Sequence, residues 1–256
     1  MASLTCWASE TTSRVKTKLV ALTASTPDGP LSLALMVLTV VTGLVDAISF
    51  LGLGRVFTAN MTGNVVLLGF AVAGAPGLSI PRSLTSLIAF LFGATLGGGL
   101  AVAMAATSRR RWLVTAAVAE AGLLFAAALT SVGFDIGSAT PSSGVYAVIV
   151  LAAVAMGLRN ATIRKLEVPD MTTTVLTNIL TGLAADSSPA GGNNPRSGRR
   201  AASVLLMFAG AAIGTLLLRF SLPLILVLSG VLVLVAAAVF ASLPTGSTVN
   251  RRPCLR

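Results

Sequence analysis

Long apolar segments separated by short polar ones dominate this chain. Eight apolar segments can be delimited, at about residues 31–53, 58–75, 81–107, 112–133, 142–163, 171–185, 201–219 and 221–243. A helix needs about 20 apolar residues to cross a bilayer, and six of the eight segments meet that length comfortably. The pattern therefore predicts an all-α polytopic integral membrane protein.

The segments 58–75 and 171–185 differ from the other six. The first begins with the polar sequence TANMTGN and is limited by Pro76, and the second is short and rich in threonine. Non-helical backbone at membrane depth is tolerated where protein or a water-filled cavity surrounds it. We therefore expect six transmembrane helices and two short re-entrant or half helices.

These two unusual segments occupy matching places in the two halves of the chain. The sequence GLVDA at 43–47 recurs as GLRNA at 157–161, an offset of 114 residues. Threonines and glycines recur in the same order with slightly larger offsets: Thr58 and Thr62 as Thr173 and Thr177, and Gly93 and Gly97 as Gly210 and Gly214. The sequence thus predicts two membrane repeats, 31–133 and 142–243, between a polar cytoplasmic tail (1–30) and a basic C-terminal tail (244–256).

The distribution of basic residues bears on orientation. If both short segments enter and return, 15 Lys and Arg lie on the side of the N-terminus and 3 on the other side. Basic residues favour the cytoplasm, so both termini are expected there. Eight crossings give 10 against 8, and seven crossings, with only 171–185 returning, give 5 against 13, so these topologies remain alternatives.

Three crossings in each half would make the two repeats inverted. The short helices are then expected to enter from opposite faces and to meet near the middle of the membrane. Short, interrupted apolar segments at corresponding places of two halves are a pointer to the binding site of a transporter.

Composition removes several functional classes. The 256 residues are 55% hydrophobic and only 10% charged, with a mean hydropathy of +0.91, whereas soluble domains carry about 25% charged residues. The chain has no histidine, which excludes Ser-His-Asp triads and His-ligated metals. Cys6 and Cys254 lie in opposite tails, which argues against a metal cluster or a disulfide framework.

The net charge of +10 is spread over the connections between apolar segments. That distribution suits contact with anionic lipid rather than one basic face for nucleic acid. We therefore expect the lipid bilayer as a partner and no nucleic acid.

The residues resemble a known family. The sequences GLVDAISFLGLGRVFTANMTGNVVLLG (43–69) and GLRNATIRKLEVPDMTTTVLTNILTGLA (157–184) are similar to the YoaK-type family of bacterial membrane proteins. The resemblance covers roughly residues 35–243, and the first motif is the more specific one. That family is a domain of unknown function, so the resemblance implies a bacterial inner-membrane location and supplies no catalytic residues.

Two acidic residues lie inside predicted spans. Asp46 is deep in the first span, where a carboxylate costs about 2.5–3.5 kcal/mol and requires a partner. The candidates are the Thr and Asn motifs, a proton and Arg159, and Asp46 is either a proton or cation coupling site or a polar link between the halves. Glu120 is either part of a proton path with Asp46, or lies nearer the surface, or hydrogen-bonds to Thr or Ser on a neighbouring helix.

The richest polar group at membrane depth lies at the start of the two short segments and consists of Thr58, Asn60, Thr62, Asn64, Thr173, Thr177 and Asn178. Thr58 and Thr62 share one face if that stretch is helical. Such side chains cap helix starts, and a helix N-terminus favours an anion or a polar solute. Four basic residues would strengthen the preference for an anion: Arg55, Arg159, Arg164 and Lys165. We predict a solute or ion pathway from this polar group with Asp46, Arg159 and Asn160; the alternative is that these side chains form only caps and interhelical hydrogen bonds.

The glycine pairs of the two repeats favour close helix packing. We expect Gly93, Gly97, Gly210 and Gly214 to pack one repeat against the other within the monomer. Neither pair fits a phosphate-binding loop, so ATP-driven pumping is not expected.

Together these features favour a secondary transporter or permease for a small polar solute, anions included, with proton coupling through Asp46 as the sharper version. The alternative is a non-transporting structural or regulatory subunit of a membrane complex. A membrane enzyme is disfavoured because no catalytic constellation stands out, and no cofactor or metal is expected. The substrate and the oligomeric state stay open.

Overall fold

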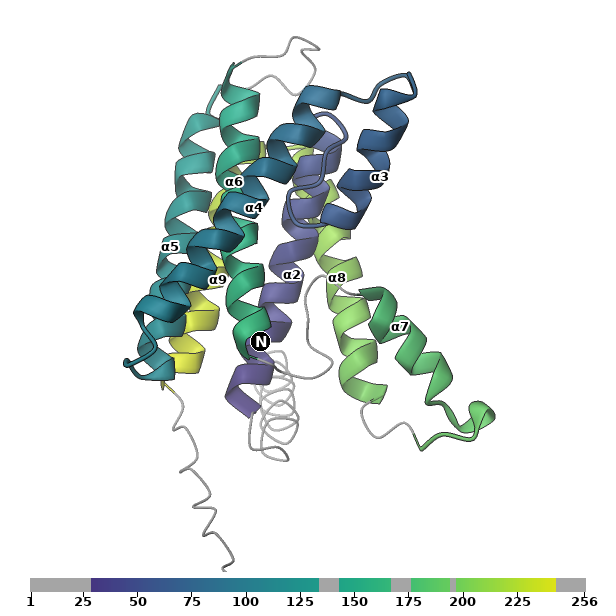
Figure 1. The fold of residues 1–256 in the computed structure, drawn as a ribbon, viewed down its shortest axis with the longest axis vertical. Coiled ribbons are helices and arrows are strands. Elements are labelled where there is room, and N and C mark those ends of the chain that lie inside the picture. The colour runs from purple at the N-terminus through teal and green to yellow at the C-terminus, as the bar shows by residue number, and fades with distance from the viewer. Residues whose placement is uncertain (1–28, 134–142, 167–175, 194–196, 243–256) are drawn as a thin grey trace, which may run out of the picture.

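The structure is a computed structural model that describes residues 29–133, 143–166, 176–193 and 197–242. Every regular element in these ranges is helical (Figure 1). Six helices are long and apolar enough to cross a membrane: α2 (Gly29–Gly52), α4 (Ile80–Ala103), α5 (Arg109–Thr130), α6 (Ser143–Leu166), α8 (Ser197–Leu218) and α9 (Leu222–Ser242). Three elements are shorter: α3 (Met61–Val72), α7 (Leu176–Ala185) and the 3₁₀ turn η1 (Ser188–Ala190). The protein is thus an all-helical polytopic membrane protein, as predicted.

The six long helices form one bundle and alternate in direction. In Figure 1, α2 begins and α9 ends at the lower end of the bundle, where the α4–α5 turn also lies. The connection from α2 to α4 and the turn between α8 and α9 lie at the upper end. We call these the lower end and the upper end of the bundle.

Apolar side chains cover the outside of the bundle as well as its core. Val102, Leu205 and Phe208 on α4 and α8 are 65–72% exposed, whereas Leu124 and Ile149 in the core are fully buried. Helices that are apolar all round belong in a large core or in a membrane. The exposed apolar faces therefore correspond to the surface that meets lipid.

The pairing of helices is the same when the two halves are exchanged. Helix α4 packs on α6 as α8 packs on α2, α5 packs on α6 as α9 packs on α2, and α3 packs on α4 as α7 packs on α8. Two further contacts keep this symmetry: α4 packs on α5 as α8 packs on α9, and the contact between α5 and α9 becomes itself when the halves are exchanged. The described helices therefore form two structurally equivalent halves whose helices interlock.

Glycines make the closest of these crossings possible. At four of them a Cβ atom would collide with the backbone of the helix that crosses there: Gly43, Gly93, Gly157 and Gly210. Gly93 lies against Val154 on α6, and Gly210 lies against Val40 on α2. Both members of the second contact are the repeat counterparts of the first, with offsets of 117 and 114 residues. The glycine motifs thus pack one half of the monomer against the other.

The two short helices do not meet in the middle of the bundle, so that expectation is wrong for the described residues. Helix α3 lies in the upper part and α7 beside the lower part (Figure 1), and each packs on the next helix of its own half. Because the halves are inverted, attachment to α4 and to α8 leaves the two short helices at opposite ends.

Gly93→Ala is expected to destabilise the fold, because the new Cβ atom would overlap backbone that has no room to move. Overpacking of this kind costs about 1–3 kcal/mol. Thermal unfolding in detergent should therefore show a lower midpoint for Gly93→Ala. The matched control is Gly99→Ala on the same helix, where a Cβ atom meets nothing within 4 Å. Equal midpoints for the two variants would contradict the close crossing.

Candidate functional site

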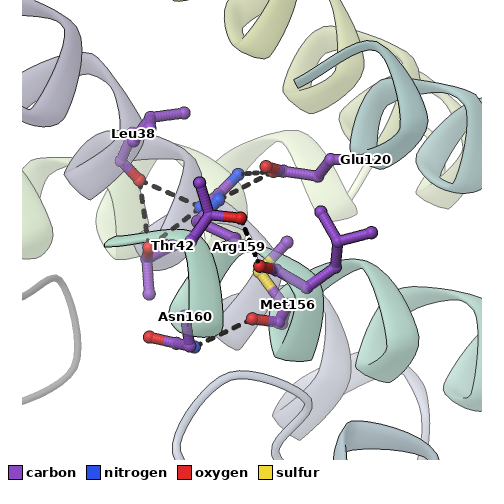
Figure 2. A network of polar contacts seen from close by, with 8 residues as sticks. Leu38, Thr42, Glu120, Met156, Arg159 and Asn160 are labelled. Atoms are coloured by element: carbon purple, nitrogen blue, oxygen red, sulfur yellow. Dashed lines mark hydrogen bonds and ion pairs between the residues drawn. The ribbon is translucent and has the colours of Figure 1, made fainter. Parts of the chain in front are cut away.

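A buried ion pair joins three helices inside the bundle (Figure 2). The side chains of Arg159 on α6 and Glu120 on α5 are 2% and 4% exposed. Arg159 donates from Nε to Glu120 Oε1 at 2.7 Å, and its Nη2 group contacts the same oxygen. Its Nη1 group donates to the Leu38 carbonyl oxygen and to the Thr42 hydroxyl of α2, both at 3.1 Å. The guanidinium thus ties α2, α5 and α6 together.

This pair differs from the partners considered in the sequence. Arg159 was one of several candidate partners of Asp46. Glu120 was placed on a proton path, nearer the surface, or beside a hydroxyl group, but the structure joins Arg159 and Glu120 to each other. The sequence contains one indication of this pairing, because two consecutive predicted spans each carry one internal charge and the two charges are of opposite sign. Each charge is costly alone in a membrane, so mutual pairing satisfies both.

Asp46 lies one helical turn beyond Thr42 on α2 and is 8% exposed. Arg159 acts on it only through space, while backbone N–H groups of Ala59 and Asn60 hydrogen-bond to the carboxylate. Its Oδ1 atom is buried and has no partner among the described residues. The carboxylate therefore fastens the start of α3 to α2 and carries no direct bond to a cation.

The segment before α3 is held in place by a second polar group. Asn64 is 1% exposed; its Oδ1 accepts from Phe57 N at 2.8 Å, and its Nδ2 donates to the Phe57 carbonyl oxygen. Ser86 on α4, which the sequence analysis missed, donates to that same carbonyl oxygen at 2.6 Å. Asn60 caps α3 by accepting from Gly63 N at 3.2 Å. Asn64 thus holds the segment before α3 in place, whereas Asn60 is exposed at the start of the helix.

The two threonines of the first motif do not share a helix face. Helix α3 begins at Met61, so Thr58 precedes it and adopts loop backbone. Thr58 is fully buried, and its Oγ1 has no partner among the described residues, whereas Thr62 is exposed. Because the helix does not include Thr58, the side chains of Thr58 and Thr62 do not share a helix face.

The second copy of the motif is placed differently. Asn160 on α6 donates from Nδ2 to the Met156 carbonyl oxygen at 2.9 Å (Figure 2). Thr177 and Asn178 are exposed on α7, at the lower end, and Thr173 lies outside the described residues. Among the described residues of the second copy, only Asn160 lies close to the first motif.

A cleft of about 540 Å³ brings several of these residues together. Its polar lining comes from the start of α3 and from the last turns of α6: Asn60, Thr62, Asn160, Arg164 and Lys165. Helix α4 contributes an apolar wall with Phe90, Ala94 and Gly98. The cleft extends from the start of α3, about half-way along the bundle, to the basic end of α6 at the lower end.

The lining of the cleft suits a polar or anionic solute. The first turn of a helix presents backbone N–H groups without helical partners and a positive dipole end. Arg164 and Lys165 are exposed and add two cations, and no carboxylate of the described residues lines the cleft. Arg55 and Arg159, which were expected to strengthen the preference for an anion, do not line the cleft. Arg55 lies beside Gly77 at the upper end, and Arg159 is paired with Glu120.

The fold and this cleft define the class: a polytopic helical membrane protein with two interlocked halves and a partly polar cleft between α3, α4 and α6. Residues 34–248 match the family described as "Protein of unknown function (DUF1275)", and the chain belongs to it. It is 38% identical over 155 residues to the UPF0700 transmembrane protein YoaK of Bacillus subtilis (strain 168). That match covers 60% of this chain and 66% of the relative, so the chain spans slightly less than two thirds of the relative's length. No solved structure is significantly similar to the chain.

Glu120→Gln is expected to destabilise the protein by about 3–5 kcal/mol, because it leaves the Arg159 charge buried without a counter-charge. The double variant Glu120→Met/Arg159→Met removes both charges and should recover most of the loss. Chemical unfolding in a fixed lipid–detergent mixture measures both differences. A single variant as stable as the unmodified protein would show that the pair is not a structural centre.

Proposed function

We propose that this protein is a secondary transporter or permease that moves a small polar solute, with a preference for anions, through the cleft between α3, α4 and α6. The single observation that supports the proposal most is the extent of the cleft, from the α3 N-terminus about half-way along the bundle to the lower end. Water-filled access to a broken helix is how transporters bind solutes at membrane depth.

The lower end is proposed to face the cytoplasm of a bacterial cell, with the inner membrane as its location. Basic residues concentrate there, in the first turn of α5 and at the adjacent ends of α6 and α8: Arg109, Arg110, Arg111, Arg164, Lys165, Arg199 and Arg200. Basic residues near helix ends favour the cytoplasmic side. The cleft would then open to the cytoplasm, and anionic metabolites would meet a positive entrance.

Proton coupling through Asp46 is part of the proposal. The charged carboxylate holds backbone N–H groups at Ala59 and Asn60, next to the inner end of the cleft. Protonation would remove the charge from these hydrogen bonds, and bonds to a charged group are roughly twice as strong as neutral ones. The start of α3 would then loosen from α2, which would link proton uptake to the geometry of the solute site.

Single cysteines at the cleft should react with thiol reagents that cannot cross the membrane. In a Cys6→Ser/Cys254→Ser background, Asn60→Cys and Thr62→Cys are expected to react when the reagent is on the cytoplasmic side. Phe208→Cys is the control, because Phe208 is 72% exposed on the apolar face of α8, where no ionised thiol is expected. If neither cleft position reacts in folded protein, the cleft is dry and the alternative of a non-transporting subunit takes its place.

The same variants test the preference for anions. A negatively charged methanethiosulfonate reagent is expected to react faster at Asn60→Cys than a positively charged one of similar size. Arg164→Gln/Lys165→Gln should reduce that ratio, because these two cations line the entrance. A ratio that does not change in the double variant would remove the assigned role of the basic entrance.

The coupling through Asp46 predicts a dependence of labelling on pH. Lowering the pH should speed labelling of Asn60→Cys, because the protonated acid releases the α3 start. The rate is corrected for thiol ionisation with a cysteine at Ser188, which is exposed in the η1 turn outside the spans. In Asp46→Asn the corrected rate should be high and independent of pH, since the amide resembles the neutral acid. The same pH profile with and without Asp46 would refute the coupling role while leaving the cleft intact.

A further inference from the structure

A second cavity lies at the lower end, on the other side of Lys165 from the cleft. It has a volume of about 290 Å³ and lies at the turn between α4 and α5. Thr107, Arg109, Trp112 and Lys165 line it, together with two alanines and a methionine from the end of α4 and the following turn. Three helices thus enclose a space that is basic at one side and apolar at the other.

The charges among the described residues favour an anion at this place. Helix α5 begins with Arg109, Arg110 and Arg111 and has no acidic residue in its first turn. A helix N-terminus carries a positive partial charge, so basic side chains there are unfavourable. Neither Arg109 nor Lys165 forms an ion pair within the part of the chain that the structure describes. The positive charge of the first turn and of both side chains therefore lies at one cavity, and no carboxylate of the described residues lines that cavity.

The depth of the cavity points to the lipid surface. Helix α4 ends at Ala103 and α5 begins at Arg109, so the cavity lies where two spans leave the membrane. Val102, directly beside it in sequence, is 72% exposed on the apolar surface. Trp112 is 8% exposed and forms one wall, and tryptophan favours the level of the lipid head groups.

We propose that this cavity binds the phosphate head group of an acidic phospholipid from the cytoplasmic leaflet. Arg109 would bind the phosphate through two parallel N–H bonds, and Lys165 would add a point charge. The N–H groups of the first turn of α5 would complete the site. The apolar side of the cavity, at the end of α4, accommodates the glycerol and the start of an acyl chain, which a free phosphate ion would leave empty.

The site would also connect lipid to the cleft, because Lys165 lines both cavities. Basic pockets between helices on the cytoplasmic side are a recurring way to bind acidic head groups. The proposal does not depend on transport, since it concerns the fold and its lipid surroundings alone.

The test measures lipid retention by native mass spectrometry after purification with a mixture of phosphatidylglycerol and phosphatidylcholine. The unmodified protein should retain phosphatidylglycerol. Arg109→Gln should weaken that retention by at least about tenfold, because the variant loses two hydrogen bonds to a charged group and each contributes about tenfold or more. Arg110→Gln is the matched control: the same change in charge, one residue away, at an exposed side chain that does not line the cavity.

Three outcomes would overturn the proposal. Equal losses in the Arg109 and Arg110 variants would reduce the effect to general surface charge. Equal retention of phosphatidylglycerol and phosphatidylcholine by the unmodified protein would show no selectivity for acidic lipid. Inorganic phosphate that displaces phosphatidylglycerol at millimolar concentration, in an Arg109-dependent manner, would assign the site to a soluble phosphate compound.

Discussion

A membrane does not solvate charge, and the central contacts of this protein follow from that constraint. Arg159 and Glu120 lie inside spans, where each alone would be costly, and they satisfy each other. The guanidinium has further donors, and these reach the Thr42 hydroxyl and the Leu38 carbonyl oxygen of α2. One ion pair thereby fixes the relative position of three helices that come from both halves of the chain.

Around this centre, close packing replaces the hydrophobic effect that drives helices together in water. Lipid is as apolar as the side chains, so contact area and small residues decide which helices meet. Gly93 against Val154 and its counterpart, Gly210 against Val40, bring backbones into direct contact. Because the two contacts match when the halves are exchanged, each half packs on the other through the same type of helix crossing.

The equivalence of the halves is broken where polar groups gather. The segment before α3 is fastened on one side by the Asp46 carboxylate and on the other by Asn64 and Ser86. Asn160, which corresponds to Asp46 in the second half, instead faces the cleft beside α3. A rigidly held helix start next to an open cleft is the arrangement from which the proposed transport derives.

The sequence by itself determined the class and the number of long helices, because the length of each apolar segment is a local property of the chain. The recurrence of Gly43 at Gly157 predicted the repeat in the same way. The sequence also marked Asp46 and Glu120 as residues that needed partners. Which partner each one has was decided by the tertiary structure alone, since Arg159 was a candidate partner of Asp46 on sequence grounds and helix packing directs it to Glu120. Pairing across helices depends on rotation and depth, and a linear pattern of apolar and polar positions does not specify either.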